Sequence, residues 1–143
     1  MIIITKEVLI NKQLDVPEIT GIYDLITRKR DGTITSQAPV IVSGKHLDML
    51  HVGDVRLCLV PTIDPDAITE VVNIYKYTDN QVIVSLPFLM PGEYLPVVRI
   101  MREGEEEMRY IFPVTWVVRP EGYDDIACRY NVGRKNKAGK EQE

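Results

Sequence analysis

The stretch from Leu86 to Tyr94 constrains the fold more than any other part of the chain. It reads Leu-Pro-Phe-Leu-Met-Pro-Gly-Glu-Tyr and separates two strand-like runs, residues 81–86 and 94–101. Pro87 and Pro91 cannot donate ladder hydrogen bonds, so sheet pairing stops between the two runs. A β-sandwich uses such a break to pass the chain from one sheet to the other. We therefore expect a crossing here, with the Tyr94 hydroxyl hydrogen-bonded to the backbone a few residues upstream.

The run from residue 108 to residue 118 shows the clearest alternation in the chain. Its apolar and aromatic residues recur at every second position and define one face: Met108, Tyr110, Phe112, Val114, Trp116 and Val118. A period of two with one apolar face predicts a strand of a sandwich. We expect Trp116 to be a packing anchor of the core, because an indole ring supplies a large apolar area.

Turn signals divide the rest of the chain into further short strands, at residues 19–26, 40–44, 55–60 and 69–77. Helical periodicity extends over no more than a turn or two. The sequence therefore predicts an all-β sandwich of seven to eight mostly antiparallel strands. We expect it to span residues 19–119. A last short strand or turn at residues 121–126 and a flexible basic tail are expected within residues 120–143.

Residues 1–18 are expected to form an N-terminal extended segment, with apolar pieces at residues 2–4 and 8–10. Val16-Pro17 marks its boundary, because a residue that precedes proline is pushed toward extended geometry. We expect an edge strand within the chain's own sheet. The alternatives are a strand exchanged with a neighbouring molecule and a linker.

Composition and net charge limit the classes of partner that the chain can bind. The chain has 143 residues and a net charge of −4, and a folded body of that sign does not attract nucleic acid or an anionic membrane non-specifically. The N-terminus has no basic leader, and its apolar run is too short for a signal peptide or a membrane span, so we expect a cytoplasmic protein. Cys58 and Cys128 lack short metal-type spacing and are expected as free thiols.

Two pairs of residues are candidate metal ligands. His46 and His51 could share a metal only with a third ligand, and Asp48 and Asp54 are the nearby candidates. Asp64 and Asp66 could hold a hard cation, but no loop of calcium-binding length surrounds them. We expect surface histidines and a turn built by Asp and Pro, with no metal and no cofactor.

The order of these motifs resembles a bacterial domain-of-unknown-function family with an immunoglobulin-like fold of the transcription-factor (TIG-like) type. The resemblance covers about residues 19–118 and rests on four segments: Ile19 to Thr35, Val40 to Leu47, Asp54 to Leu57, and the crossing with Leu86, Pro87, Leu89, Pro91, Gly92 and Tyr94. It implies an immunoglobulin-like β-sandwich and no catalytic residues. In that family the domain often follows an HU-like or IHF-like DNA-binding domain. Only about 18 residues precede the matching segment here, so we do not transfer the DNA-binding role.

The sequence favours a non-enzymatic binding or protein-interaction module. Its partner is an unidentified protein or a second copy bound through the N-terminal strand. The residues expected to contact a partner are Ile2, Ile4, His46, His51, Asp64 and Asp66. The alternative is an accessory nucleic-acid-associated protein with a basic tail, formed by Arg129, Arg134, Lys135, Lys137 and Lys140. An enzyme would need Cys58 beside His46 or His51, and nothing in the sequence brings them together.

Overall fold

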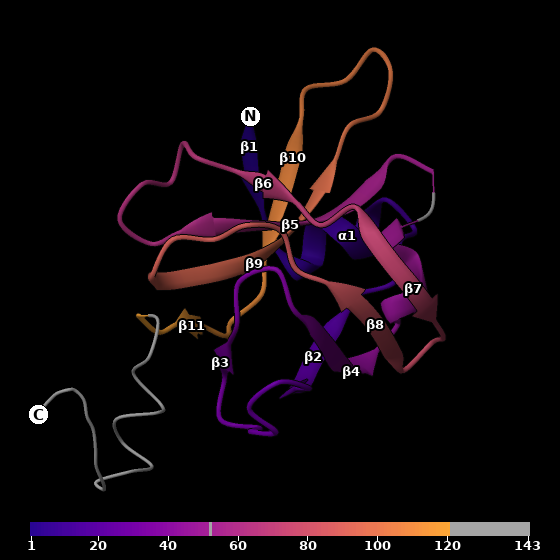
Figure 1. Cartoon of the computed structure of the whole chain (residues 1–143). Coiled ribbons are helices and arrows are strands. Elements are labelled where there is room, and N and C mark those ends of the chain that lie inside the picture. Colours follow the sequence, from indigo (N-terminus) through magenta and orange to yellow (C-terminus); the bar gives the residue numbers. More distant parts are fainter. Residues whose placement is uncertain (52, 121–143) are drawn as a thin grey trace, which may run out of the picture.

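Two β-sheets packed face to face form the body of the chain in the computed structural model, which describes residues 1–51 and 53–120 (Figure 1). One sheet has seven strands and the other has four among these residues. The apolar side chains of both sheets meet between them and form one core that includes Trp116, Phe112 and Leu57. The predicted all-β sandwich is confirmed.

The seven-stranded sheet is built around its longest strand, β9. Its strands are β1 (Ile2–Ile4), β3 (Thr33–Ile34), β5 (Val55–Pro61), β6 (Thr69–Glu70), β9 (Gly92–Ile100), β10 (Met108–Ile111) and β11 (Trp116–Val118). β9 pairs in antiparallel fashion with β5, β10 and β11. β1 pairs with β10, and β3 with β11, in parallel.

The four-stranded sheet has the order β2-β4-β8-β7, and all its pairs are antiparallel. Its strands are β2 (Glu18–Asp24), β4 (Pro39–Lys45), β7 (Asn73–Tyr77) and β8 (Gln81–Ser85). β2 and β7 are its edges. A short 3₁₀ helix, η1 (Leu47–His51), follows β4 and contacts β5, β7 and β8.

The chain crosses from one sheet to the other between β8 and β9, as the two prolines predict. Tyr94 is buried, and its hydroxyl donates a hydrogen bond of 2.7 Å to the carbonyl oxygen of Met90, four residues upstream. The predicted role of Tyr94 at this corner is confirmed. The crossing is also tied to the β3–β4 connection, because the amide of Leu89 donates to the Ser36 hydroxyl at 2.7 Å.

Substitution of Tyr94 by Phe should lower the free energy of unfolding by about 1 kcal/mol, because it removes this one hydrogen bond and keeps the ring. Urea denaturation followed by tryptophan fluorescence would measure the loss. Tyr77→Phe is the matched control, since Tyr77 is 48% exposed and its hydroxyl makes no hydrogen bond to the described residues. Equal stability of the two variants would contradict the role of the corner.

The alternation predicted for residues 108–118 is present but divided between two strands. Met108, Tyr110 and Phe112 are buried, and the residues between them are only partly buried. Ile111 pairs with Val97 and Trp116 pairs with Tyr94, so residues 112–115 lie opposite residues 95–96 and bulge out. Because the bulge adds an even number of residues, Trp116 stays on the core face.

One predicted strand, residues 69–77, is in fact two strands in different sheets. β6 pairs with β5, and β7 pairs with β8. Between them Val71 is buried and Val72 is 59% exposed where the chain crosses. The run contains no proline or glycine, so local sequence gives no sign of this second crossing. This split, the division of residues 108–118 into β10 and β11, and the short strand β3 raise the number of strands in the described residues above the predicted seven to eight.

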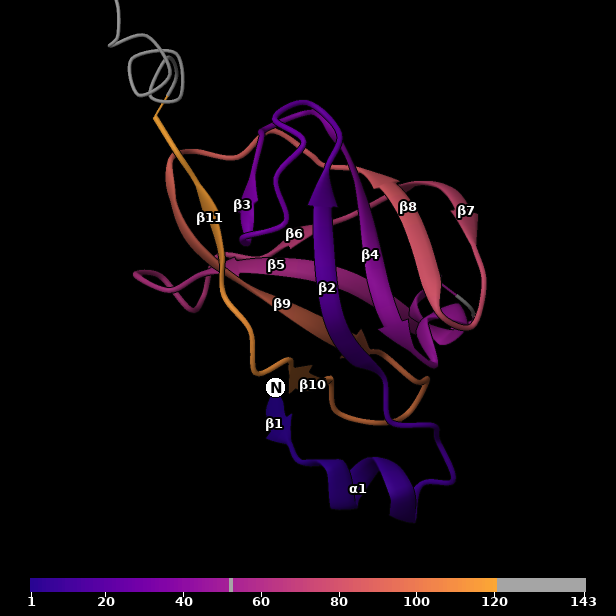
Figure 2. The same cartoon turned by 90° about the horizontal axis from the view of Figure 1, so that it is seen from below.

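The expectation of an extended N-terminal segment is corrected at residues 6–11, which form helix α1 (Lys6–Asn11). Leu9 is fully buried and belongs to the core, with Val8 packed against it. This burial outweighs the low helix propensity of the β-branched residues. Figure 2 shows α1 beside β1, at the end of the molecule where β10 lies.

Candidate interaction surfaces

The predicted N-terminal contact residues have different environments. β1 is an edge strand of the seven-stranded sheet. Ile4 is 7% exposed and lies in the core, so its side chain cannot contact a partner, which corrects the expectation for this residue. Ile2 and Ile3 keep 45% and 53% of their surface. The accessible apolar residues of this strand are therefore Ile2 and Ile3.

His46 lies beside two carboxylates that were not its predicted neighbours. Its Nδ1 is 3.8 Å from an oxygen of Asp15 and 3.6 Å from an oxygen of Asp79, contacts that are ion pairs only when the imidazole is protonated. Asp54 instead pairs with Arg102 at 3.6 Å. His51 is the last residue of η1, and its side chain lies outside the described part. Within residues 1–51 and 53–120, no group of three or more His, Cys, Asp or Glu could hold a metal.

The remaining predicted contact residues lie on exposed or undescribed segments. Asp64 and Asp66 are exposed on the β5–β6 loop, where the amide of Ala67 donates to the carbonyl of Asp64 at 3.1 Å. This geometry matches a turn built by Asp and Pro. The strand or turn expected at residues 121–126 and the basic tail lie outside the described residues, which includes Arg129, Arg134, Lys135, Lys137 and Lys140.

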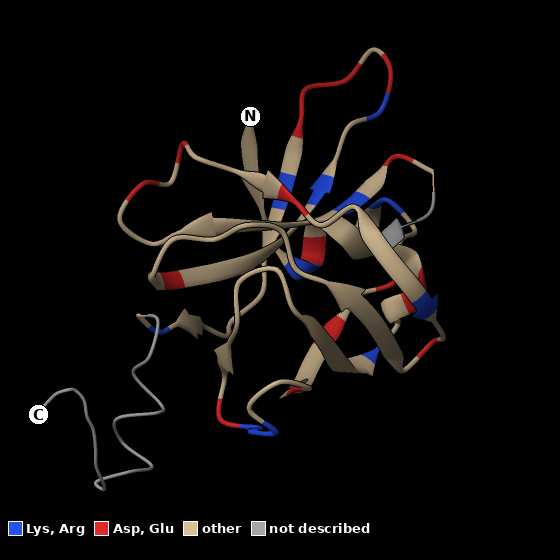
Figure 3. Cartoon of the chain, viewed as in Figure 1, with Lys and Arg blue, Asp and Glu red and all other residues tan. Residues whose placement is uncertain are grey.

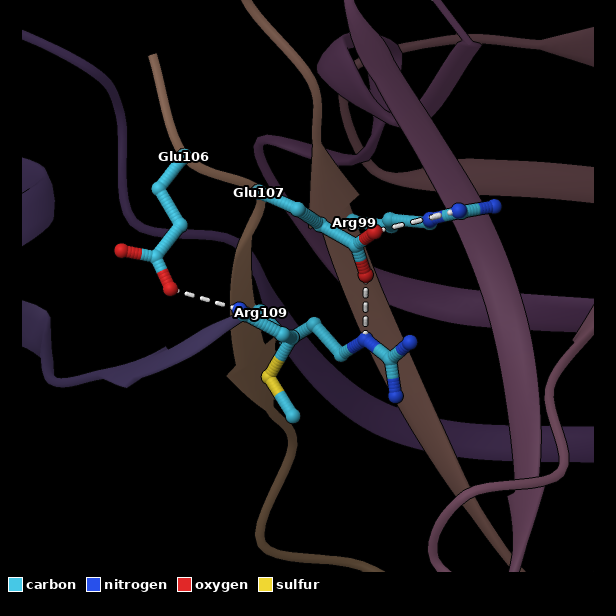
Figure 4. A network of polar contacts seen from close by, with 5 residues as sticks. Arg99, Glu106, Glu107 and Arg109 are labelled. Carbon is cyan, nitrogen blue, oxygen red and sulfur yellow. Dashed lines mark hydrogen bonds and ion pairs between the residues drawn. The ribbon is translucent and has the colours of Figure 1, made fainter.

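Three arginines occupy neighbouring register positions across the outer face of the seven-stranded sheet: Arg56, Arg99 and Arg109. Glu107 lies between two of them, accepting hydrogen bonds from Arg99 Nη2 at 3.1 Å and Arg109 Nε at 2.6 Å (Figure 4). Glu70 lies 3.6 Å from Arg56. The two carboxylates offset most of the positive charge, so we assign this network to sheet stability rather than to anion binding.

Glu107→Gln should lower the free energy of unfolding by about 2 kcal/mol at neutral pH, because both hydrogen bonds lose their charged acceptor. The hydrogen bond from Arg99, with one from Arg109, lowers the pKa of Glu107 below its ordinary 4.5 against the opposing effect of burial. A carboxyl whose pKa is lower in the folded than in the unfolded protein stabilises the fold fully at pH values above its ordinary pKa. That stability is lost as the pH falls through the lowered value.

The stability difference between wild type and Glu107→Gln should therefore be complete above pH 4.5 and shrink below it. Urea titrations at several pH values would measure the difference. Glu103→Gln is the control, because Glu103 is exposed on the same hairpin. A difference that does not change with pH would show that Glu107 acts through its shape alone.

Cys58, the candidate nucleophile in the sequence, is fully buried in β5. Burial raises the pKa of its thiol to about 11, and the nearby Arg99 only partly opposes the effect. The thiol is therefore protonated at neutral pH. His46 follows β4, in the other sheet, so the structure places it on a different element from Cys58.

The crossing between β8 and β9 presents two large apolar side chains to solvent. Phe88 and Met90 are 64% and 63% exposed, whereas Leu86 and Leu89 are buried. The backbone is held at both ends of this segment, by the Pro87 carbonyl that accepts from Gln37 at 3.2 Å and by the hydrogen bonds of Leu89 and Tyr94 described above. Phe88 and Met90 therefore project from an ordered backbone.

The turn after β2 adds two more apolar side chains at the same end of the sandwich. Leu25 is 38% and Ile26 is 61% exposed. The amide of Leu25 donates to the carbonyl of Pro39, and Pro39 in turn pairs with Ser85 at the end of β8. Figure 2 shows this turn and the crossing at one end of the molecule. We call Leu25, Ile26, Phe88 and Met90 the crossing-loop patch.

From the sequence alone the crossing is interpreted as architecture, and none of these four residues is predicted to contact a partner. A signal was present, because the three residues between Pro87 and Pro91 are all large and apolar: Phe88, Leu89 and Met90. In a segment without strand periodicity, the sequence does not say which apolar residue faces the core. The exposed side chains follow from the three-dimensional anchoring of the backbone.

Comparisons with known proteins show the fold. No family model and no curated protein matches the chain. The structure is similar to that of a "putative bacterial DNA binding protein" from Bacteroides vulgatus ATCC 8482, with a TM-score of 0.57 and 22% identity. The match covers 72% of this chain and 48% of that one, so the chain spans about half the length of the Bacteroides protein.

A second similar structure is CopC from Methylosinus trichosporium OB3b. The TM-score is 0.38 and the identity 10%, over 74% of this chain and 96% of that one. In the described part of the chain, no helix has the length and apolar character needed to cross a membrane.

Proposed function

We propose that the chain is a non-enzymatic protein-interaction module that binds its partner through the crossing-loop patch. The observation that carries the proposal is the exposure of Phe88 and Met90, at 64% and 63%, on a backbone fixed by the Tyr94 and Ser36 hydrogen bonds. Aromatic residues and Met are enriched at the centres of protein interfaces. A preordered loop also loses little conformational entropy on binding.

Affinity capture tests this function. The full chain would be immobilised and exposed to a lysate of the source organism, in parallel with a Phe88→Ser, Met90→Ser double variant. We expect recovery of specific partners to fall by about 10-fold or more in the variant, the loss typical of interface anchors. Ile63→Ser is the matched control, because Ile63 is 94% exposed outside the patch. Recovery of the same proteins by the double variant would contradict the proposal.

We further propose that the sandwich belongs to the immunoglobulin-like (TIG-like) family that its motifs resemble. Support comes from the crossing, where Tyr94 makes the backbone hydrogen bond typical of such sandwiches. The motif of residues 19–35 also has a structural role, since Asp24 accepts a hydrogen bond from the Thr35 hydroxyl at 2.7 Å. An alignment of homologues with these residues retained would support membership.

A second candidate function is association with nucleic acid. It is favoured by the name of the Bacteroides protein and by the charge distribution along the sequence. Residues 1–120 contain 12 Lys or Arg and 16 Asp or Glu, whereas residues 129–140 contain five basic residues and no acidic one. When a basic segment of this kind neutralises phosphates, the counterions condensed on the nucleic acid are released.

This candidate predicts DNA binding that weakens steeply with salt. Fluorescence anisotropy with labelled duplex and single-stranded DNA would compare the full chain with a variant in which Arg129, Arg134, Lys135, Lys137 and Lys140 are replaced by Gln. The replacement keeps the chain length constant. Absence of binding by the unmodified chain at low salt would eliminate this function.

A further inference from the structure

Most of the large apolar side chains exposed on the described residues gather at two places, and three others, Val72, Tyr75 and Tyr77, lie on or beside β7. Four form the crossing-loop patch. Five others surround the N-terminal strand and the nearby β9–β10 hairpin, and we call them the N-terminal patch: Met1, Ile2, Ile3, Ile10 and Met101. Isolated apolar residues on a surface need no explanation, but gathered ones mark contact sites. Ile3 and Ile10 are 53% and 60% exposed.

The two patches lie at opposite ends of the molecule. β9 begins at Gly92, beside the crossing, and ends at Ile100, which pairs with Met108 next to Ile2 of β1. A nine-residue strand therefore separates them. Figure 2 shows the crossing and the β2–β3 turn at one end, and β1, α1 and the β9–β10 hairpin at the other.

The charges beside the two patches have opposite signs. Arg28, Lys29 and Arg30 follow Ile26 in the β2–β3 turn, whereas Glu103, Glu105 and Glu106 lie on the tip of the β9–β10 hairpin (Figure 3). Lys12 lies 3.6 Å from Glu105 and the N-terminal ammonium lies 2.6 Å from Glu106, so the unbalanced acidic charge of the tip rests mainly on Glu103. The acidic β5–β6 loop projects from the seven-stranded sheet and lies away from the basic turn in both views of the fold.

We infer that the partner of the crossing-loop patch is the N-terminal patch of a second copy of this chain. This inference rests on the proposed use of the crossing-loop patch as a binding surface. In such a contact, apolar side chains meet apolar side chains, and the basic turn of one copy faces the glutamate tip of the next. Complementary potentials of this kind select the orientation of the contact.

Symmetric contacts would be less favourable, because they bring like charges together. Two N-terminal patches face to face would oppose the two glutamate tips, and two crossing-loop patches would oppose the two basic turns. The head-to-tail contact is heterologous, so it leaves one patch free at each end of a pair. Further copies can therefore add, and the assembly grows with concentration or closes into a ring.

Mixing two blocked variants tests this geometry. The first variant, Phe88→Ser with Met90→Ser, removes the crossing-loop patch, and the second, Ile3→Ser with Ile10→Ser, removes the N-terminal patch. Light scattering on full-length protein should show an average mass that rises with concentration for wild type and for the control Ile63→Ser. Each blocked variant should be monomeric, with self-association weakened by about 100-fold.

An equimolar mixture of the two blocked variants keeps one intact contact, so it should form a species of two chains and nothing larger. This recovery also shows that both variants are folded. A charge exchange provides a second readout. Arg28→Glu should weaken assembly, and Arg28→Glu combined with Glu103→Arg in one chain should restore it.

Three results would overturn the inference: a monomeric wild type at every concentration, assembly by either blocked variant, or a mixture that stays monomeric. A monomeric wild type would leave the interaction-module function intact if the Phe88→Ser, Met90→Ser variant still loses its captured partners. If that variant both assembles and captures proteins like the wild type, the inference and the proposed function fail together.

Discussion

Gly44→Ala should cost about 3 kcal/mol of stability, the upper end of what an extra methyl group causes in a packed site. Gly44 lies in β4, opposite Ile19 of β2, beside the irregularity in pairing between Ile19 and Gly21. A Cβ on Gly44 would overlap the backbone carbonyl of Glu18. Because the obstacle is backbone, no side-chain rotation relieves it, and β2 would have to move away from β4.

Urea denaturation followed by tryptophan fluorescence would measure this loss. Gly21→Ala is the matched control, because Gly21 belongs to the same irregular pairing and an added Cβ there meets nothing within 4 Å. Gly21→Ala should leave stability nearly unchanged or raise it slightly through a less flexible unfolded chain. If both variants have the same urea midpoint, the close approach of β2 and β4 is not the reason that position 44 needs glycine.

The sequence predicted features that depend on strand periodicity and on strong chain breakers. Pro87 and Pro91 lack the backbone N–H that sheet pairing needs, whatever the tertiary structure. The end of β8 and the crossing after it could therefore be located from the sequence. The alternation around Trp116 also predicted the buried face, because side chains alternate along any strand. Tyr94 was recognisable because its place after the proline-glycine corner is specific.

Features that depend on distant contacts could not be predicted. Residues 69–77 resemble one strand, and only the positions of β5 and β8 decide that β6 and β7 belong to different sheets. Leu9 becomes helical because the core accepts it, whereas its local sequence resembles a strand. The candidate surface was missed for the same reason, since the exposure of Phe88 depends on the anchoring of its backbone to Ser36.

Asp24→Ala should also destabilise the fold strongly, by about 3 kcal/mol, because a buried carboxylate and its hydrogen bonds are lost together. Asp24 is fully buried at the end of β2. Its Oδ1 accepts from the amide of Ile26 at 2.8 Å, and its Oδ2 accepts from the Thr35 hydroxyl at 2.7 Å. Alanine would leave both donors without their acceptor in a site that water reaches poorly.

Asp24→Asn separates the hydrogen bonds from the charge, because the amide keeps an oxygen for the Ile26 amide. Its loss should be about 1 kcal/mol, the value of weakening one hydrogen bond. Equal losses for Ala and Asn, measured by urea denaturation, would show that the hydrogen bonds to the turn are unimportant.

Asp24 also links stability to the proposed binding surface, because the backbone it holds carries Leu25 and Ile26 of the crossing-loop patch. Asp24→Asn keeps the bond to Ile26, so its self-association should stay close to that of the wild type under conditions where the protein is folded. Thr35→Val removes the hydrogen bond to Oδ2 of Asp24 and leaves Oδ1 to accept from the Ile26 amide. A folded Thr35→Val variant should therefore lose stability and retain assembly. If it loses assembly instead, the geometry of the patch depends on the whole Asp24 network, and the turn is less rigid than its hydrogen bonds indicate.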